Sequence, residues 1–205
     1  MHVTLGVDIG GTKIAAGLVT VEGAVIARRV AATPVAAGAS AILATALDVS
    51  CRVLAEGRGL DVIAVGVGSA GEVDCERGVV TYASDTLPGW AGLALAQEFT
   101  AATGLPAVVD NDVNAFAIGE GQFGAGRGFR DVLYVAVGTG IGGAVVLDGR
   151  LRRGAHWAAG EIGHLIAAWD GARVCSCGRR GHLEAYAAGP ALAARYRELA
   201  GAGEA

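Results

Sequence analysis

Residues 3–20 read VTLGVDIGGTKIAAGLVT, two apolar runs on either side of a Gly10-Gly11-Thr12 turn. Runs of this kind that are joined by so few residues pair as antiparallel strands. Another turn and a third apolar run, 24–30, follow directly. The stretch therefore predicts that the chain opens with three antiparallel strands.

The same arrangement returns at 132–147, VLYVAVGTGIGGAVVL, as an apolar run, a glycine turn and a second apolar run over 144–147. Between and after these hairpins, hydrophobic spacing predicts helices at 37–57, 90–103, 112–122 and 190–199, and strands at 62–67 and 107–109. The repetition predicts an α/β protein of two related lobes around a cleft, 1–125 and 126–205. The second lobe has only two or three predicted strands, so we expect it to be incomplete.

Composition excludes several classes of protein. Hydrophobic residues make up 53% of the 205 positions and charged residues 18%, which argues against disorder. The net charge of −4 offers no basic surplus for nucleic acid. Neither a secretion signal nor a convincing transmembrane run is found, and the cysteines do not form a disulfide framework. We expect a soluble, cytoplasmic protein with neither nucleic acid nor membrane as a partner.

The two glycine turns are candidate phosphate loops. Glycines allow close backbone approach, so that successive N–H groups can point at a phosphate. Thr12 and Lys13 can contact phosphate oxygens beside Gly10 and Gly11, and Asp8 can hold a water of Mg²⁺. The alternative for this turn alone is an ordinary hairpin.

The second turn, 138–143, matches G-x-G-x-x-G. A dinucleotide site needs a helix after this motif, whereas a strand is expected here, so a nicotinamide site is excluded. The chain also lacks a G-x-x-x-x-G-K-[ST] loop. Two glycine hairpins facing a cleft would hold a triphosphate.

Polar residues gather where the short strand 107–109 ends, in the run Asp110-Asn111-Asp112-Val113-Asn114. The carboxyl end of a strand is where α/β sites form. A carboxylate here can accept the proton of a substrate hydroxyl. Helix capping by Asn111 or Asp112 is the alternative, although four polar residues in five exceed what a cap needs.

A metal site is predicted from two cysteines and two histidines within nineteen residues: His164, Cys175, Cys177 and His182. Zn²⁺ in structural sites is tetrahedral with such ligands. With no open position implied, the zinc would be structural and would fix Glu161, His164 and Glu184 around one spot. A glycine-rich surface loop with free thiols is the alternative.

Six stretches together resemble sugar kinases of the ROK family, in the glucokinase branch: VDIGGTK at 7–13, LPGW at 87–90, DNDVNAFAIGE at 110–120, VGTGIGGAVV at 137–146, AGEIGH at 159–164 and CSCGRRGHLE at 175–184. The resemblance implies the actin-like ATPase (ribonuclease H-like) fold. It also implies transfer of the γ-phosphate of ATP to a sugar hydroxyl, with Mg²⁺ and structural Zn²⁺, in a homo-oligomer when full length.

The resemblance assigns roles to individual residues. Asp112 is the implied catalytic base. The implied sugar-binding residues are Asn111, Glu161, His164 and Glu184, and His164 would place one ring nitrogen on zinc and the other towards the sugar. The implied phosphate loops contain Asp8, Gly10, Gly11 and Thr12 in the first and Thr139 and Gly140 in the second.

The chain departs from the family pattern at several places. His182 stands where a third cysteine is usual, Ala70-Gly71 where Pro-Gly is frequent, and Asp85 near a usual asparagine. Glucose is the first expected substrate, followed by N-acetylglucosamine, N-acetylmannosamine and fructose. Because family members continue beyond this length, we expect weak ATP binding by these 205 residues and partly exposed apolar strands at 132–137 and 145–147. An inactive sugar- and zinc-binding remnant and a sugar-sensing regulatory module are the alternative functions.

Overall fold

The computed structural model describes residues 1–202, and its contacts divide the chain into two compact units. The first unit is Met1–Phe129 with Ala155–Trp157, and the second is Arg130–Gly154 with the described residues from Ala158 onward.

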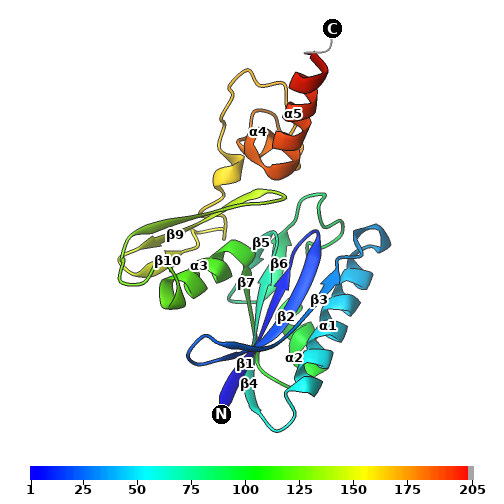
Figure 1. Ribbon diagram of the computed structural model, residues 1–205, viewed down its shortest axis with the longest axis vertical. Helices are drawn as coiled ribbons and strands as arrows, with labels where there is room; N and C mark the ends of the chain where they lie inside the picture. The colour runs from blue at the N-terminus through cyan, green and yellow to red at the C-terminus, as the bar shows by residue number, and fades with distance from the viewer. Residues whose placement is uncertain (203–205) are drawn as a thin grey trace. The chain divides into compact units, whose positions relative to one another are not determined.

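A five-stranded sheet organises the first unit, in the order β3-β2-β1-β4-β7 (Figure 1). Strands β1 (His2–Ile9), β2 (Lys13–Thr20) and β3 (Val25–Ala32) form the antiparallel meander that the opening sequence predicts. Strands β4 (Asp61–Ser69) and β7 (Ala107–Asn111) continue the sheet in parallel with β1. The carboxyl ends of β1, β4 and β7 therefore meet at one edge.

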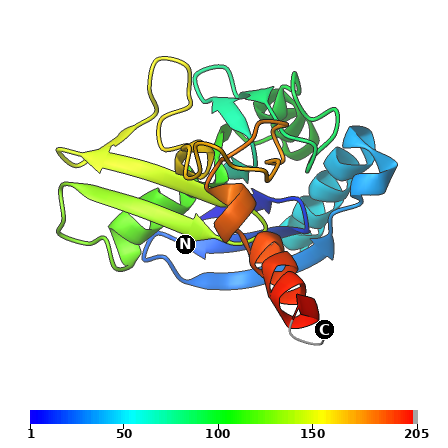
Figure 2. The ribbon, with the colours of Figure 1, turned by 90° about the horizontal axis from the view of Figure 1, so that it is seen from above.

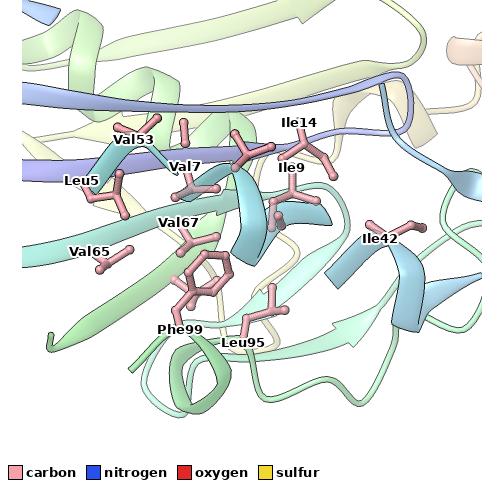
Figure 3. Close-up of a cluster of buried hydrophobic side chains, with 14 of the residues drawn as sticks. Leu5, Val7, Ile9, Ile14, Ile42, Val53, Val65, Val67, Leu95 and Phe99 are labelled. Atoms are coloured by element: carbon pink, nitrogen blue, oxygen red, sulfur yellow. The ribbon is translucent and has the colours of Figure 1, made fainter. Parts of the chain in front are cut away.

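Helices cover both faces of this sheet. Figure 1 shows α1 (Ala39–Glu56) and α2 (Leu95–Thr103) together on one face and α3 (Asp112–Phe123) on the other. The main core lies under α1 and α2, because alternate residues of β1 and β4, such as Leu5 and Val67, point to that side (Figure 3). On the other face, Gly68 lets α3 approach: a Cβ there would lie 3.3 Å from Cβ of Ala115.

Three local features of the first unit differ from the sequence-based expectation. A small hairpin of β5 (Glu72–Asp74) and β6 (Val79–Tyr82), and a 3₁₀ turn η1 (Val35–Ala37), were not predicted. Helix α2 begins at Leu95 rather than at residue 90, since Gly89 and Gly92 have left-handed φ angles of 73° and 89°. The fully buried Trp90 instead donates its indole N–H to the hydroxyl of Ser69 at 2.9 Å.

The second unit contains the antiparallel sheet β10-β9-β8. Its strands are β8 (Val132–Val137), β9 (Ile141–Leu147) and β10 (Arg150–Arg152), followed by the 3₁₀ turn η2 (Ile162–His164). The chain then passes through a long loop to α4 (Glu184–Ala187), which leads into α5 (Gly189–Ala202), orange and red in Figure 2.

One face of β8 is open, as the sequence predicts. The alternating side chains of Leu133, Val135 and Val137 are 57%, 49% and 61% exposed. Leu147 on β9 is also exposed. Among the described residues, no helix has the length and apolar character that crossing a membrane requires.

Candidate active site and metal centre

The first glycine loop joins β1 to β2 and is anchored by backbone contacts. Gly10 N–H donates to Lys13 O at 3.1 Å, and the Thr33 hydroxyl donates to Gly10 O at 2.6 Å. The flanking Ile9 and Ile14 are fully buried, whereas Thr12 and Lys13 are exposed. The hydrophobic flanks thus fix a turn whose polar side chains face solvent.

Strand register brings Asp8 and the end of β7 to the same level of the sheet. Asp8 pairs with Gly68 of β4, and Gly68 pairs with Asp110 of β7. One residue further, Ser69 of β4 pairs with Asn111. Polar groups from three parallel strands therefore share one edge, the position that α/β sheets use for ligands.

Asn111 caps helix α3. Its Oδ1 accepts from the N–H groups of Val113 and Asn114 at 2.9 and 3.1 Å, so the capping alternative describes this residue correctly. Its Nδ2 donates to Gly71 O at 3.0 Å. The cap thus fixes both the start of α3 and the loop after β4, and a sugar contact would use the second amide hydrogen.

Asp112, the first residue of α3, sits in an environment that favours its protonated form. Burial raises the pKa of the Asp112 carboxyl, and the charge of Asp8 raises it further, while the Val113 N–H that donates to Oδ1 at 2.9 Å works in the opposite direction. Partial desolvation also raises the pKa of Asp8, against the lowering effect of Lys13 and Arg28. A carboxylate whose pKa is raised is a stronger proton acceptor.

The four predicted metal ligands converge in the second unit. One ligand atom from each of His164, Cys175, Cys177 and His182 lies within 4.8 Å of all the others. His164 Nδ1 is 3.2 Å from His182 Nδ1 and 3.6 Å from Cys175 Sγ, and Cys177 Sγ is 3.3 Å from His182 Nδ1. Zinc bonds of 2.0–2.3 Å give tetrahedron edges of about 3.3–3.8 Å. These three separations are close to the edges of such a tetrahedron, so the cluster has the ligand types and the approximate spacing for a four-coordinate metal ion.

Two acidic side chains adjoin this centre. His164 turns its other ring nitrogen, Nε2, towards Glu161, whose Oε2 lies 3.7 Å away. Glu184 accepts from the Ser176 hydroxyl at 2.7 Å through Oε1 and from the Ile141 N–H at 3.0 Å through Oε2. Although burial acts to raise the pKa of Glu184, these hydrogen bonds outweigh it and lower the pKa. Glu184 is therefore held as a carboxylate.

The second glycine loop, 138–140, lies between β8 and β9 and is held by residues far along the chain. Gly189 N–H donates to Gly138 O at 2.9 Å, and Glu184 binds the Ile141 N–H at the other end. A Cβ at Gly140 would lie 2.5 Å from Oε2 of Glu184. A side chain at this position would therefore displace the Glu184 carboxylate from its hydrogen bond with the Ile141 N–H.

Behind this loop, β9 meets the segment before η2 backbone to backbone. A Cβ at Gly143 would lie 2.6 Å from Gly160 O, and one at Gly160 would overlap Gly143 O. Gly163 in η2 approaches Ile141 O in the same way. Glycines thus allow the ligand-bearing turn to lie against the start of β9.

The predicted residues fall into two groups, one in each unit. The first unit holds Asp8, Gly10, Gly11, Thr12, Lys13, Asn111 and Asp112, and the second holds Thr139, Gly140, Glu161, His164, Cys175, Cys177, His182 and Glu184. Sequence reasoning missed Ser176 and Gly189, which bind the second group together. The serine lies between two predicted ligands, but no spacing rule indicates where its hydroxyl points.

Comparison with known proteins gives consistent matches. The family model described as "ROK family" matches residues 4–204. A glucokinase of Streptomyces coelicolor is 41% identical over 203 residues, 98% of this chain and 61% of its own length. A glucokinase of Thermotoga maritima is 37% identical over 194 residues, 95% and 60% of the two lengths. The chain thus spans about three fifths of these relatives.

Solved structures match as well. A glucokinase from Streptomyces griseus, in complex with glucose and AMPPNP, aligns with a TM-score of 0.85 at 41% identity, covering 98% of this chain and 62% of that one. A transcriptional regulator homologous to the MLC protein of E. coli aligns with a TM-score of 0.82 at 28% identity, covering 100% and 51%. These likenesses confirm the predicted mixed α/β, actin-like fold over the part that the chain covers.

Proposed function

The chain belongs to the ROK family, and from that premise we propose that it supplies part of the machinery that transfers the γ-phosphate of ATP to a hexose hydroxyl. Glucose is the proposed substrate, because the S. coelicolor and T. maritima relatives are glucokinases and the S. griseus enzyme was solved with glucose. The observation that carries the proposal is Asp112, a partly buried carboxyl at the start of α3 whose pKa is raised by desolvation.

In the proposed reaction Asp112 takes the proton of the attacking sugar hydroxyl. The hydroxyl oxygen forms a bond to the γ-phosphorus while the bond from that phosphorus to the bridging oxygen breaks, and ADP leaves. The proton remains on Asp112 until it is lost to solvent. Asn111, Glu161, His164 and Glu184 are proposed to hold the other sugar hydroxyls, with His164 offering Nε2.

The phosphates are assigned to the two glycine loops. Gly10, Gly11, Thr12 and Lys13 form the proposed first loop, and Thr139 and Gly140 belong to the second. Exposed Lys13 offers positive charge, and Asp8 is proposed to hold a water of Mg²⁺. The metal supplies neutralisation of the charge that develops on the phosphates.

Zinc is the metal proposed for the Cys/His cluster. Two thiolates and two imidazoles suit Zn²⁺ in a tetrahedral structural site. Since four protein ligands fill that geometry, no position remains for a reacting water, and the ion would act by fixing the loop 175–182. We further propose a cytoplasmic location and a homo-oligomeric full-length protein.

A coupled assay of ADP release tests the proposed function. The full-length protein carrying this chain is mixed with ATP, Mg²⁺ and, in turn, glucose, N-acetylglucosamine, N-acetylmannosamine and fructose. ADP release that depends on glucose is expected, and release with another sugar alone would correct the substrate. If no sugar leads to ADP release, the proposed kinase function is wrong.

A sugar-sensing module is the second candidate, favoured by the structural match to the transcriptional regulator. It predicts sugar binding without ADP release. Calorimetric titration with glucose, run beside the kinase assay, distinguishes the two functions.

A further inference from the structure

We propose that Ser176 and Glu184 form a relay that positions the second glycine loop, so that metal held by the Cys/His cluster fixes the shape of 138–141. The importance of this relay for catalysis rests on the kinase function proposed above. The relay itself is a property of the second unit, and it makes Ser176 a positioning residue.

The first link joins the metal loop to Glu184. Ser176 lies between the ligands Cys175 and Cys177, and its hydroxyl donates to Glu184 Oε1 at 2.7 Å. Cys175 Sγ lies 3.5 Å from the same oxygen. A thiolate bound to a metal has no proton to donate, so in the loaded centre the Ser176 hydroxyl remains as the donor of this pair.

The second link joins Glu184 to the glycine loop. The other carboxylate oxygen, Oε2, accepts from the Ile141 N–H at 3.0 Å, at the first residue of β9. The two ends of the carboxylate therefore bind two segments that are 35 residues apart in the sequence (176 against 141). A carboxylate has about four acceptor positions, so these two bonds still leave room for a sugar hydroxyl.

The far end of the loop is tied to the same region. Gly189 N–H, five residues after Glu184, donates to Gly138 O at 2.9 Å. Loop 138–140 is thus bound at both ends by the segment that follows the last metal ligand, His182. On its other side, η2 with the ligand His164 lies against Ile141 through Gly163. Displacement of the ligand loop would release all of these contacts.

Amide hydrogen exchange at Ile141 measures the relay without requiring catalysis. The zinc-loaded 205-residue chain, labelled with ¹⁵N, is compared with Ser176→Ala, Ser176→Thr and Ser84→Ala. In Ser176→Ala we expect exchange at Ile141 to be about tenfold faster, with the zinc content unchanged. Ser176→Thr keeps the hydroxyl and should restore slow exchange. Ser84→Ala removes a serine hydroxyl in the other unit, whose partner is Thr86, and should change nothing at Ile141.

Removal of zinc by a chelator tests whether the metal and Ser176 act through the same contact. In the wild type it should speed exchange at Ile141, and in Ser176→Ala the further increase should be smaller, because the link is already broken. Equal exchange in wild type and Ser176→Ala, a chain that takes up no zinc, or fully additive effects of chelation and mutation would each overturn the relay.

Magnesium tripolyphosphate, titrated into the same proteins, separates the relay from the kinase function. Weaker binding in Ser176→Ala than in wild type or Ser176→Thr supports positioning of a phosphate loop. If no variant binds tripolyphosphate but exchange at Ile141 responds as described, the relay stands and the phosphate role of this loop is wrong. If the wild type binds tripolyphosphate while Ser176→Ala behaves identically in both measurements, the relay is wrong and the phosphate role stands.

Discussion

The two glycine hairpins are similar in sequence but are stabilised in different ways. The loop 10–13 lies between fully buried Ile9 and Ile14, and its contacts come from its own turn and from Thr33 on the adjoining segment. The loop 138–140 follows the exposed Val137 and is held by Glu184 and Gly189, more than forty positions away. The first loop is supported by a hydrophobic core. The second is supported by the polar loop 175–182 and the residues after it, and that polar loop is itself proposed to need a bound metal ion.

Loss of the metal should have the largest effect, because it should disturb the second glycine loop and leave the first unchanged. Cys175→Ser removes one of the two thiolate ligands and should abolish zinc binding. Because zinc contributes an apparent ~10–16 kcal/mol to the folding of small zinc-finger peptides, its loss should also expose the amides of 138–141 to exchange. Amides of β1 and β2 should be unaffected. Elemental analysis and exchange mass spectrometry provide the measurement.

Two further variants control this experiment. Cys51→Ser, at an exposed position of α1, should retain a single zinc ion per chain. His182→Cys should also retain the metal, since thiolate and imidazole are both zinc ligands. Zinc that persists in Cys175→Ser, or is lost in His182→Cys, would mean that the ligand set is wrong.

Asp112→Asn should separate catalysis from loop support. An amide does not accept the hydroxyl proton, and loss of a general base typically costs about 10²–10⁴ in rate. Zinc content and exchange at Ile141 should persist, because the substitution lies in the other unit. Glucose binding should also persist, because an amide has nearly the same size as the carboxyl and leaves the other sugar contacts in place. Turnover is measured by ADP release in the active full-length protein, and a loss below about tenfold would exclude Asp112 as the base.

Alanine at one glycine of each loop, Gly10 and Gly140, should affect the two loops unequally. A Cβ at Gly10 would have its nearest neighbour, Lys13 O, at 3.5 Å, an ordinary contact, whereas at Gly140 it would displace the Glu184 carboxylate. Gly140→Ala should therefore cost the second unit about 1–3 kcal/mol, the cost of an unsatisfied buried group, and Gly10→Ala much less.

Urea unfolding of the zinc-loaded chain, followed by exchange in each unit, measures both substitutions. In a Glu184→Ala background the cost of Gly140→Ala should largely disappear, since the clash is with that side chain. Equal costs at Gly10 and Gly140 would refute the distinction between the two loops.

The smallest expected effect concerns the charges beside the first loop. Because the charge of Asp8 helps to raise the pKa of Asp112, Asp8→Asn should lower that pKa, while the larger contribution of burial remains. Carboxyl ¹³C titration by NMR measures the change, and Asp48→Asn on the surface of α1 is the control. An unchanged or raised pKa of Asp112 in Asp8→Asn would contradict the electrostatic argument.

The sign of the accompanying pH effects follows from the raised pKa values. Asp112 acts as a base only when ionised, so turnover should fall as the pH decreases through its raised pKa, and Asp8→Asn should move that fall to lower pH. For stability, a raised native pKa means that the contribution of the protonated carboxyl is full below the unfolded pKa and is lost as the pH rises through the native one.

The sequence is a good guide wherever local pattern determines structure. Alternating apolar residues and a short turn were sufficient for β1 and β2, and the spacing of two cysteines and two histidines was sufficient for a cluster that fits a metal. Residues 72–74 are too few to show a period, so the small hairpin β5–β6 was missed. The contact of Glu184 with Ile141 joins positions 43 apart, and no local pattern encodes it. Such contacts depend on how the long loop 165–183 returns to the sheet.

The meeting of Gly143 with Gly160 has a consequence for the evolutionary record of this protein. A Cβ at Gly143 would clash with the backbone of Gly160, and a Cβ at Gly160 would clash with the backbone of Gly143. A larger residue at one site therefore cannot be offset by a smaller one at its partner, which is already the smallest. Sequences that keep this contact will show both glycines unchanged, and covariation between the two columns will be absent although the residues touch.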